Sequence, residues 1–333
     1  MKPANRLQHI KEYYFATKLR EVRAMVAAGK PVINMGIGSP DGAPPQAAFK
    51  ELQRTLFEPN AHQYQSYKGL PQLREAMAQY YATYFNVNLQ PDSEIQPLMG
   101  SKEGITHISL AFLNPGDQVL VPNPGYPTYT SVSKLVGADP IFYTLKEANN
   151  YLPDFEALEQ TDLTKVKLMW LNYPHMPTGA LATKTVFKKL IAFAKTHDIL
   201  VVNDNPYSHI LNNEPLSILS VQGAKEVALE LNSLSKSFNM AGWRVGMLSG
   251  SSEYINYVMK VKTQMDSGMF LPLQMGVVQA LRTNHSWFTS LNNVYAERKQ
   301  LLLKLVDLLN CEVVASKAGM FVWAKLPKGE TSE

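Results

Sequence analysis

The stretch that decides the fold reads Ser233-Leu-Ser-Lys236-Ser-Phe-Asn-Met-Ala-Gly-Trp-Arg244-Val-Gly246. It lies between two apolar runs, residues 227–231 and 245–248, that are typical of buried strands. A lysine at the edge of a packed sheet is poorly solvated, so its neutral amine becomes more accessible, as a Schiff-base lysine requires. Ser233, Ser235 and Arg244 can gather around a phosphate, where the guanidinium offers a two-pronged set of donors.

A lysine beside a phosphate-binding group is typical of pyridoxal phosphate (PLP) enzymes, in which the aldehyde of the cofactor is bonded to the lysine. The same residues also fit an ordinary loop with a solvated lysine and a salt-bridged arginine, because strings of this kind are short and common. Which of the two interpretations holds depends on whether the other residues of a PLP site occur elsewhere in the sequence, in an order that such a fold allows.

Composition limits the classes of protein that this chain can represent. With 333 residues, 45% of them hydrophobic, the chain can bury a large core and predicts one large domain plus a smaller one. The net charge of +4 is spread without basic runs, so we expect neither nucleic acid nor a membrane as partner. The single cysteine, the lack of a signal-like start and the lack of a bilayer-length apolar run predict a cytoplasmic protein.

Short apolar runs alternate with helical patterns through most of the chain. Helices are expected near residues 7–28, 46–57, 71–85, 102–113, 127–136, 154–160 and 183–197, with longer helical patterns from about 251. Strands are expected at residues 32–35, 118–121, 140–143, 166–171, 199–203 and 227–231. This alternation predicts an α/β fold with a mostly parallel sheet between layers of helices.

Three segments are expected in the domain organisation. Residues 1–40 form an N-terminal arm and a small-domain segment, and residues 41–265 form the large, cofactor-binding domain. Residues 266–333 form connecting helices and the start of a C-terminal small domain. The smaller α+β domain is therefore expected to combine the two ends of the chain.

Polar residues follow the predicted strands, at the edge where ligands bind on parallel sheets. Asn172 follows one strand, Asp204 another, and Lys236 comes shortly after a third. Asp204 can pair with a pyridine nitrogen and keep it protonated, and that cation would lower the pKa of the carboxyl. The alternative is a helix or turn cap. Tyr207 can donate to the phenolic oxygen of the cofactor or can be a half-buried core tyrosine.

Three further motifs fit the same chemistry. Gly100-Ser-Lys-Glu-Gly104 begins a predicted helix. The backbone N–H groups at a helix N-terminus, together with a serine hydroxyl, can bind an anion. Serine is also a common N-cap residue, which is the alternative interpretation. Tyr126 can stack on a pyridine ring or can be a turn aromatic. The tyrosine-rich loop at residues 62–70 indicates a subunit interface or ligand contact, or a well-satisfied surface loop.

Together these motifs give the chain a family resemblance. From about residue 30 onward it resembles the fold-type I PLP-dependent aminotransferases of class I/II, the aspartate aminotransferase superfamily, and within them the LL-diaminopimelate aminotransferase-like branch. The motifs are Ile33-Asn-Met-Gly-Ile-Gly38-Ser-Pro-Asp41, Tyr64-Gln-Ser-Tyr67-Lys-Gly-Leu-Pro-Gln-Leu-Arg74, Gly100-Ser-Lys-Glu-Gly104, Val121-Pro-Asn-Pro-Gly-Tyr126-Pro, Leu171-Asn-Tyr-Pro-His-Met-Pro-Thr-Gly179, Asp204-Asn-Pro-Tyr207 and the stretch from Ser233 to Gly246.

The resemblance implies a role for each residue of the cofactor site. Lys236 forms the Schiff base and moves the proton between Cα and the cofactor. Asp204 binds the pyridine nitrogen, Tyr207 binds the phenolic oxygen, and Tyr126 stacks on the ring. The phosphate is held by Ser101, Lys102 through its backbone, Ser233, Ser235 and Arg244.

The resemblance also implies partners. Tyr64 reaches the phosphate of the cofactor in a neighbouring subunit, so a homodimer with shared active sites is the expected active unit. Gly38 lies against the substrate carboxylate. No metal is expected. The substrates are an L-amino acid and a 2-oxo acid.

Two features depart from the family pattern. The family carries an asparagine before Pro177-Thr-Gly, where its amide donates to the phenolic oxygen; this chain has Met176, which cannot donate. Asn172 or His175 is expected to compensate, and Asn172 is favoured. In the family, an arginine beyond the strand that corresponds to residues 321–327 binds the substrate carboxylate. The sequence ends before that position, so no arginine is assigned to this role. The small domain is therefore expected to be incomplete.

The resemblance predicts a PLP-dependent aminotransferase of amino-acid metabolism that works by a ping-pong mechanism. A diaminopimelate, methionine or aromatic type of donor is indicated. A C–S lyase or decarboxylase on the same scaffold stays open, because cofactor, lysine and aspartate serve all these reactions. A non-catalytic PLP-binding protein is a further alternative, against which the intact Lys236, Asp204, Tyr207 and Arg244 argue.

Overall fold

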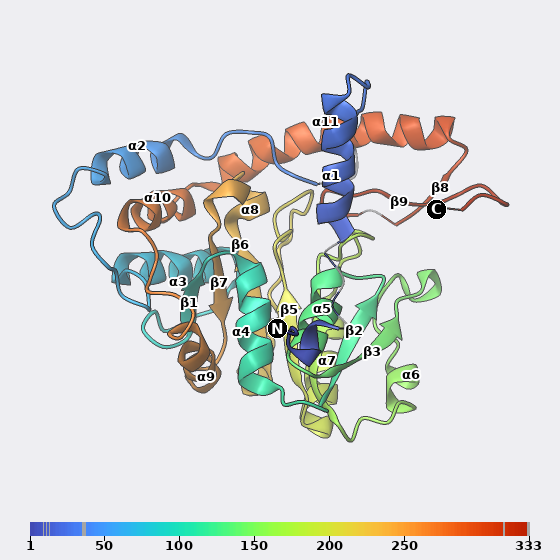
Figure 1. The fold of residues 1–333 in the computed structure, drawn as a ribbon, viewed down its shortest axis with the longest axis horizontal. Coiled ribbons are helices and arrows are strands. Elements are labelled where there is room, and N and C mark those ends of the chain that lie inside the picture. The colour runs from blue at the N-terminus through green and yellow to red at the C-terminus, as the bar shows by residue number, and fades with distance from the viewer. Residues whose placement is uncertain (9, 11, 13, 35–37, 316, 332–333) are drawn as a thin grey trace.

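The computed structural model describes residues 1–8, 10, 12, 14–34, 38–315 and 317–331. Its centre is a sheet of seven strands in the order β1-β7-β6-β5-β4-β2-β3 (Figure 1). The strands are β1 Ile95–Leu98, β2 Gln118–Asn123, β3 Asp139–Thr144, β4 Val166–Leu171, β5 Leu200–Asp204, β6 Ala228–Ser233 and β7 Gly246–Ser249. The neighbours from β3 to β6 pair in parallel, whereas β7 runs antiparallel to both β6 and β1. The predicted α/β fold with a mostly parallel sheet is confirmed.

Helices cover both faces of this sheet. They are α1 Tyr14–Ala27, α2 Gln46–Thr55, α3 Pro71–Phe85, α4 Ser101–Phe112, α5 Pro127–Leu135, α6 Phe155–Glu159, α7 Lys184–His197, α8 Leu234–Ser237, α9 Ser252–Lys262, α10 Leu271–Leu281 and α11 His285–Leu308. Apolar side chains of α4, α5 and α9 form one core with the sheet, and those of α3, α7 and α10 form the other.

The period-2 alternation of strands explains the two cores. In β4, Leu168 and Trp170 face the core under α4 and α5, while Met169 and Leu171 face the core under α7. All four side chains are fully buried. A strand that is apolar on both sides must be covered on both sides, which places β4 in the interior of the sheet.

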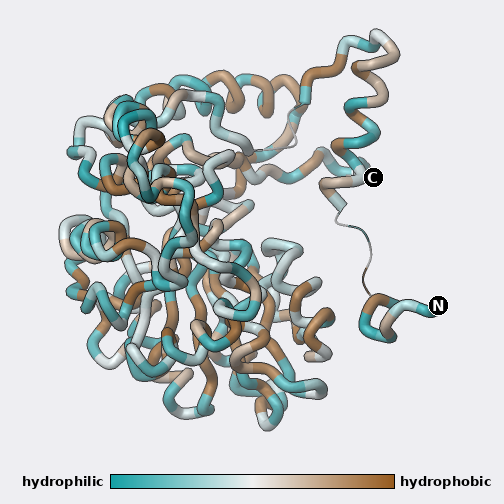
Figure 2. The backbone as a smooth tube through the Cα atoms, turned by 60° about the vertical axis from the view of Figure 1, so that its left-hand side comes forward, coloured by the Kyte–Doolittle hydropathy of each residue, from teal (hydrophilic) through white to brown (hydrophobic). Residues whose placement is uncertain are grey.

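Two segments lie outside the main sheet body. Helix α1 stands to one side of it (Figure 2). None of the residues of α1 is buried. At the far end of α11, the strands β8 Glu312–Ala315 and β9 Trp323–Lys325 pair as an antiparallel two-stranded sheet (Figure 1). The domain limits at residues 40 and 265 stay a prediction.

Three expectations about elements differ from the structure. Strand β1 was not predicted; it contains Pro97, and it lies at the edge of the sheet, where a proline without an N–H breaks no ladder. The strand expected at residues 32–35 is wrong for residues 32–34, which form no strand, and residues 35–37 lie outside the described residues. The helix expected from residue 7 begins at Tyr14, after a 3-10 turn at Asn5–Leu7.

Helix length bears on the membrane question. Within the part of the chain that the structure describes, we find no helix both long and apolar enough to cross a bilayer.

Candidate active site

The predicted cofactor residues converge on one cavity of about 220 Å³ beyond the carboxyl ends of β4, β5 and β6. It is lined by Ser101, Lys102, Tyr126, Tyr129, Asn172, Met176, Asp204, Pro206, Tyr207, Ser233, Ser235, Lys236, Ala241 and Arg244. Every residue predicted to contact the cofactor within one chain is in this set. The exception is Tyr64, which was expected to serve a neighbouring subunit.

Lys236 is positioned by the short helix α8, which begins where β6 ends. The Ser233 side chain caps this helix by accepting a hydrogen bond from the N–H of Ser235 at 3.1 Å. Lys236 is half-buried, and its Nζ donates to the carbonyl oxygen of Gly38 at 2.6 Å. Burial lowers the pKa of Lys236, and the nearby charge of Arg244 lowers it further. The neutral, nucleophilic amine is therefore more accessible than in an exposed lysine.

The carbonyl next to Lys236 is tied to another element. The indole N–H of Trp287, in the first turn of α11, donates to the backbone oxygen of Ser237 at 2.9 Å. This bond connects the turn that carries the lysine to the long helix.

Asp204 is the last residue of β5 and is only 4% exposed. Its Oδ2 accepts a hydrogen bond from the hydroxyl of Tyr129 at 2.9 Å, while its Oδ1 has no partner among the described residues. Burial raises the pKa of Asp204 to about 7, against the smaller lowering effect of the Tyr129 hydrogen bond. A protonated pyridine nitrogen would supply the missing donor and offset the desolvation, so this carboxyl fits the cofactor.

A cradle suited to a phosphate lies at the other end of the cavity. Helix α4 begins at Ser101, directly after Gly100, whose φ is +85°. A Cβ on Gly100 would lie 2.3 Å from an Nη of Arg244, and a Cβ on Gly246 would lie 2.6 Å from the backbone nitrogen of Ser101. The two glycines therefore let the guanidinium and β7 approach the start of α4 closely. Arg244 also donates to the hydroxyl of Ser235 at 3.5 Å. A guanidinium, a hydroxyl and a helix N-terminus together suit a phosphate.

Sequence reasoning missed Tyr129, which holds Asp204. Its ring stacks on Trp170 at 4.9 Å between centroids, and it meets Tyr126 edge-on at 5.6 Å. The signal was present, because Tyr126 and Tyr129 are three residues apart at the start of a predicted helix and so share one face.

The departure at Met176 is visible in the cavity. Met176 lines it, and its backbone N–H donates to Oδ1 of Asn172 at 2.8 Å. The amide of Asn172 in turn donates to the backbone oxygen of Asp204 at 2.5 Å. His175, the other candidate to compensate, is buried away from the cavity beside Thr178, and burial lowers its pKa to about 4. The geometry thus favours Asn172 over His175.

Two segments distant in sequence contact the cavity residues Tyr207 and Lys236. Tyr207 meets Phe321 edge-on at 6.1 Å, and a Cβ on Gly38 would lie 2.8 Å from the ring of Phe321. Gly38 therefore lies beside the lysine and this aromatic pair. Residues 35–37 of the same predicted motif lie outside the described residues.

Tyr64 is placed away from the cavity. It lies in the loop between α2 and α3 and is 91% exposed. A single chain does not bring this residue to the cofactor site.

Fold and site together define the class of protein. A lysine amine, an open buried carboxyl and a phosphate cradle meet at the carboxyl edge of a mostly parallel sheet, as in an aminotransferase. The family model for aminotransferases of class I and II matches residues 30–333, so the chain belongs to this family, which uses PLP. The predicted family and the predicted type of activity are confirmed.

Individual relatives are similar along the whole chain. An LL-diaminopimelate aminotransferase of Dehalococcoides mccartyi is 41% identical over 334 residues, which cover 100% of this chain and 86% of the relative. One from Aquifex aeolicus is 39% identical over 331 residues, covering 99% and 86%.

Solved structures of aminotransferases and related proteins are also similar to this chain. Apo-BacF from Bacillus subtilis has a TM-score of 0.95 and 35% identity, covering 99% of this chain and 85% of that chain. A probable N-succinyldiaminopimelate aminotransferase from Thermus thermophilus has a TM-score of 0.88 and 32% identity, covering 95% and 85%.

Proposed function

We propose that this protein is a PLP-dependent aminotransferase that moves an amino group from an L-amino acid to a 2-oxo acid in a ping-pong cycle. The observation that supports it most is that Lys236, the open carboxyl oxygen of Asp204 and the guanidinium of Arg244 border one cavity. When bound there, PLP supplies an electron sink for the pair of electrons left when the Cα–H bond breaks.

Lys236 has two proposed tasks. Its amine would hold the cofactor, and the same amine, once free, would take and return the proton at Cα of the substrate. Both tasks need the neutral amine, and the lowered pKa of Lys236 supports them.

The ring is proposed to be held by three kinds of contact. Asp204 accepts from the protonated pyridine nitrogen, Tyr126 stacks on the ring, and Tyr207 donates to the phenolic oxygen. Asn172 supplies a second donor in place of the one that Met176 lacks. The phosphate is bound by Ser101, the backbone of Lys102, Ser233, Ser235 and Arg244.

The active unit is proposed to be a homodimer. Tyr64 exposes 91% of its surface and Phe57, in the same loop, exposes 84%. Large exposed aromatic side chains in one loop suit a subunit interface, where Tyr64 reaches the phosphate in the partner. Gly38 is proposed to face the substrate carboxylate.

LL-diaminopimelate is the proposed amino donor, because curated relatives that cover the whole chain carry that activity in their names. The test is absorbance spectroscopy of the purified, PLP-loaded protein with a panel of amino acids. A donor should bleach the yellow band of the lysine-bound cofactor, and a 2-oxo acid should restore it. Release of pyruvate and ammonia from a single substrate would instead establish a lyase.

Lys236→Ala tests the central residue. Turnover should be abolished while much of the cofactor still binds, and borohydride reduction of the parent protein followed by peptide mapping should label Lys236. Lys188→Ala, at an exposed position on α7, is the control and should keep full activity. Undiminished turnover in Lys236→Ala would refute the assignment.

A further inference from the structure

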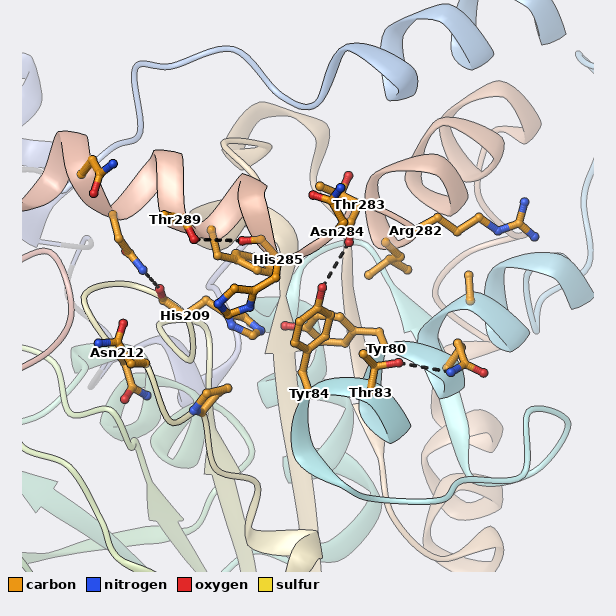
Figure 3. Close-up of a pocket in the computed structure, with 18 of the residues that line it drawn as sticks. Tyr80, Thr83, Tyr84, His209, Asn212, Arg282, Thr283, Asn284, His285 and Thr289 are labelled. Atoms are coloured by element: carbon orange, nitrogen blue, oxygen red, sulfur yellow. Dashed lines mark hydrogen bonds between the residues drawn. The ribbon is translucent and has the colours of Figure 1, made fainter.

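A second and larger cavity, of about 1000 Å³, lies between α3, the loop that follows β5 and the start of α11 (Figure 3). None of the residues assigned to the cofactor lines it. Its volume is at the upper end of the range of about 300–1,000 Å³ that is typical of small-molecule sites. His209 of the larger cavity is two residues along the chain from Tyr207 of the smaller one.

Aromatic side chains line the inner part of this cavity. The imidazole of His209 stacks on Phe288 with 4.0 Å between centroids and 10° between planes. Tyr84 meets the same imidazole edge-on at 5.0 Å, and Tyr80 lies 5.6 Å from it. Tyr84 is the partly exposed ring of this set, and it offers a flat apolar surface against which a planar ligand can pack.

Among these aromatic side chains, His209 has a ring nitrogen without a hydrogen-bond partner in the described chain. The side chain is 3% exposed, and this nitrogen is Nε2. Burial lowers the pKa of His209 to about 3, and the charge of His285 lowers it further, so the ring is neutral at physiological pH. A buried polar atom left without a partner is unfavourable by about 1–3 kcal/mol. A ligand that supplies the partner removes this penalty on binding.

The rim of the cavity is polar. Arg282 and His285 are exposed lining residues, and Glu75 is the one carboxylate among the lining residues described. The side-chain amides of Asn213 and Asn293, both exposed, add donors and acceptors. The guanidinium of Arg282 can pair with a carboxylate, and the imidazole of His285 beside it can donate a hydrogen bond.

We propose that this cavity is a second binding site, which takes a planar heteroaromatic carboxylate. The ring packs against Tyr84, His209 and Phe288, and a polar atom of the ring edge pairs with Nε2 of His209. The carboxylate lies at the rim near Arg282 and His285. This site does not depend on the reaction proposed above, since it shares no residue with the cofactor cavity.

Calorimetric titration of the purified, PLP-loaded protein with indole-3-carboxylate tests the site. This probe combines a flat ring, a ring N–H and one carboxylate. We expect binding that persists when the active site is saturated with the amino donor. His209→Phe keeps the ring stack but removes the nitrogen, so affinity should fall about tenfold, the equivalent of one hydrogen bond.

Arg282→Gln provides a second variant at an exposed position, so that its effect does not depend on the folding of a buried site. It should also weaken binding several-fold. Lys304→Gln makes the same change of charge at an exposed position on α11, about 28 Å along the helix from His285 at 1.5 Å per residue, and should leave affinity unchanged. No binding, binding abolished by the amino donor, or equal affinity in the parent and both cavity variants would overturn the proposal.

Discussion

Two buried carboxyl groups on neighbouring strands, Asp204 on β5 and Glu230 on β6, are satisfied in opposite ways. Glu230 is fully buried and accepts hydrogen bonds from the hydroxyl of Tyr81, the amide of Asn203 and the backbone N–H of Ile218, each at 3.1 Å. Both of its oxygens are occupied. Asp204 has one protein donor and leaves its second oxygen open toward the cofactor cavity.

The difference separates a structural acid from a ligand-binding acid. Burial raises the pKa of both groups, so a perturbed pKa alone does not distinguish them. The open oxygen does, because it borders a cavity in which a ligand can supply the missing donor. Asp204 is expected to matter for activity and Glu230 for stability.

Asp204→Asn should give the largest effect. An amide carries no negative charge to keep the pyridine nitrogen protonated, so kcat/KM should fall about a thousandfold, within the range typical of acid–base groups. The cofactor-free protein should be no less stable than the parent, as measured by its thermal midpoint. A variant with parental kcat/KM would show that Asp204 is structural, as Glu230 is.

The pH dependence of stability should separate the same two residues. The pKa of Asp204 in the folded, cofactor-free protein is about 7, above the ordinary value of about 3.9, so the folded state binds the proton more tightly. Stability should therefore fall as pH rises from about 4 to about 7, by up to about 4 kcal/mol from this group.

Guanidinium unfolding of the cofactor-free protein across that pH range provides the measurement. Asp204→Asn should have a shallower dependence than the parent, and the difference isolates Asp204 from Glu230, whose pKa shifts in the same direction. Identical pH profiles in parent and variant would contradict the raised pKa.

Glu230→Ala should lower the free energy of unfolding by about 3 kcal/mol, because three buried donors lose their acceptor and a cavity forms. Glu230→Gln keeps the shape and an acceptor oxygen, and should lose less than about 1 kcal/mol. Denaturant unfolding measures both. The folded fraction of either variant should keep parental kcat/KM, and a selective loss of activity in Glu230→Gln would contradict the structural role.

Tyr129→Phe should give a smaller loss of activity than Asp204→Asn. Removing the hydroxyl takes away the one protein donor to Asp204, which raises the pKa of the carboxyl, so kcat/KM should fall about tenfold. Tyr143→Phe is the matched control, since this buried hydroxyl donates to the backbone oxygen of Trp170 at 2.7 Å and does not contact Asp204. Equal losses of activity in the two variants would indicate a packing effect only.

The sequence predicted those parts of the site that are carried by local motifs. Asp204 ends an apolar run, Lys236 comes shortly after another, and Arg244 directly precedes a third. Strands of a parallel sheet end at one edge, so the convergence of Asp204 and Lys236 follows from chain order. The residue contacts of the site, including the roles proposed for Tyr207 and Tyr126, stay predictions.

Features that depend on pairing between distant segments could not be predicted. Strand β1 is four residues long with a proline, and its place at the edge is set by β7, about 150 residues later in the chain. The bond from Tyr129 to Asp204 joins residues 75 positions apart. Hydrophobic periodicity describes which face of an element is buried, and it carries no information about which polar atoms meet across that face.

The fluorescence of Trp287 should depend on whether the cofactor cavity is occupied. The indole of this residue donates to the carbonyl beside Lys236, and Trp170, another of the four tryptophans, stacks on the tyrosine that holds Asp204. A chromophore that absorbs at the wavelengths of indole emission and binds in the cavity should quench their fluorescence by energy transfer. Loading with vitamin B6 aldehyde could then be followed in real time without any label.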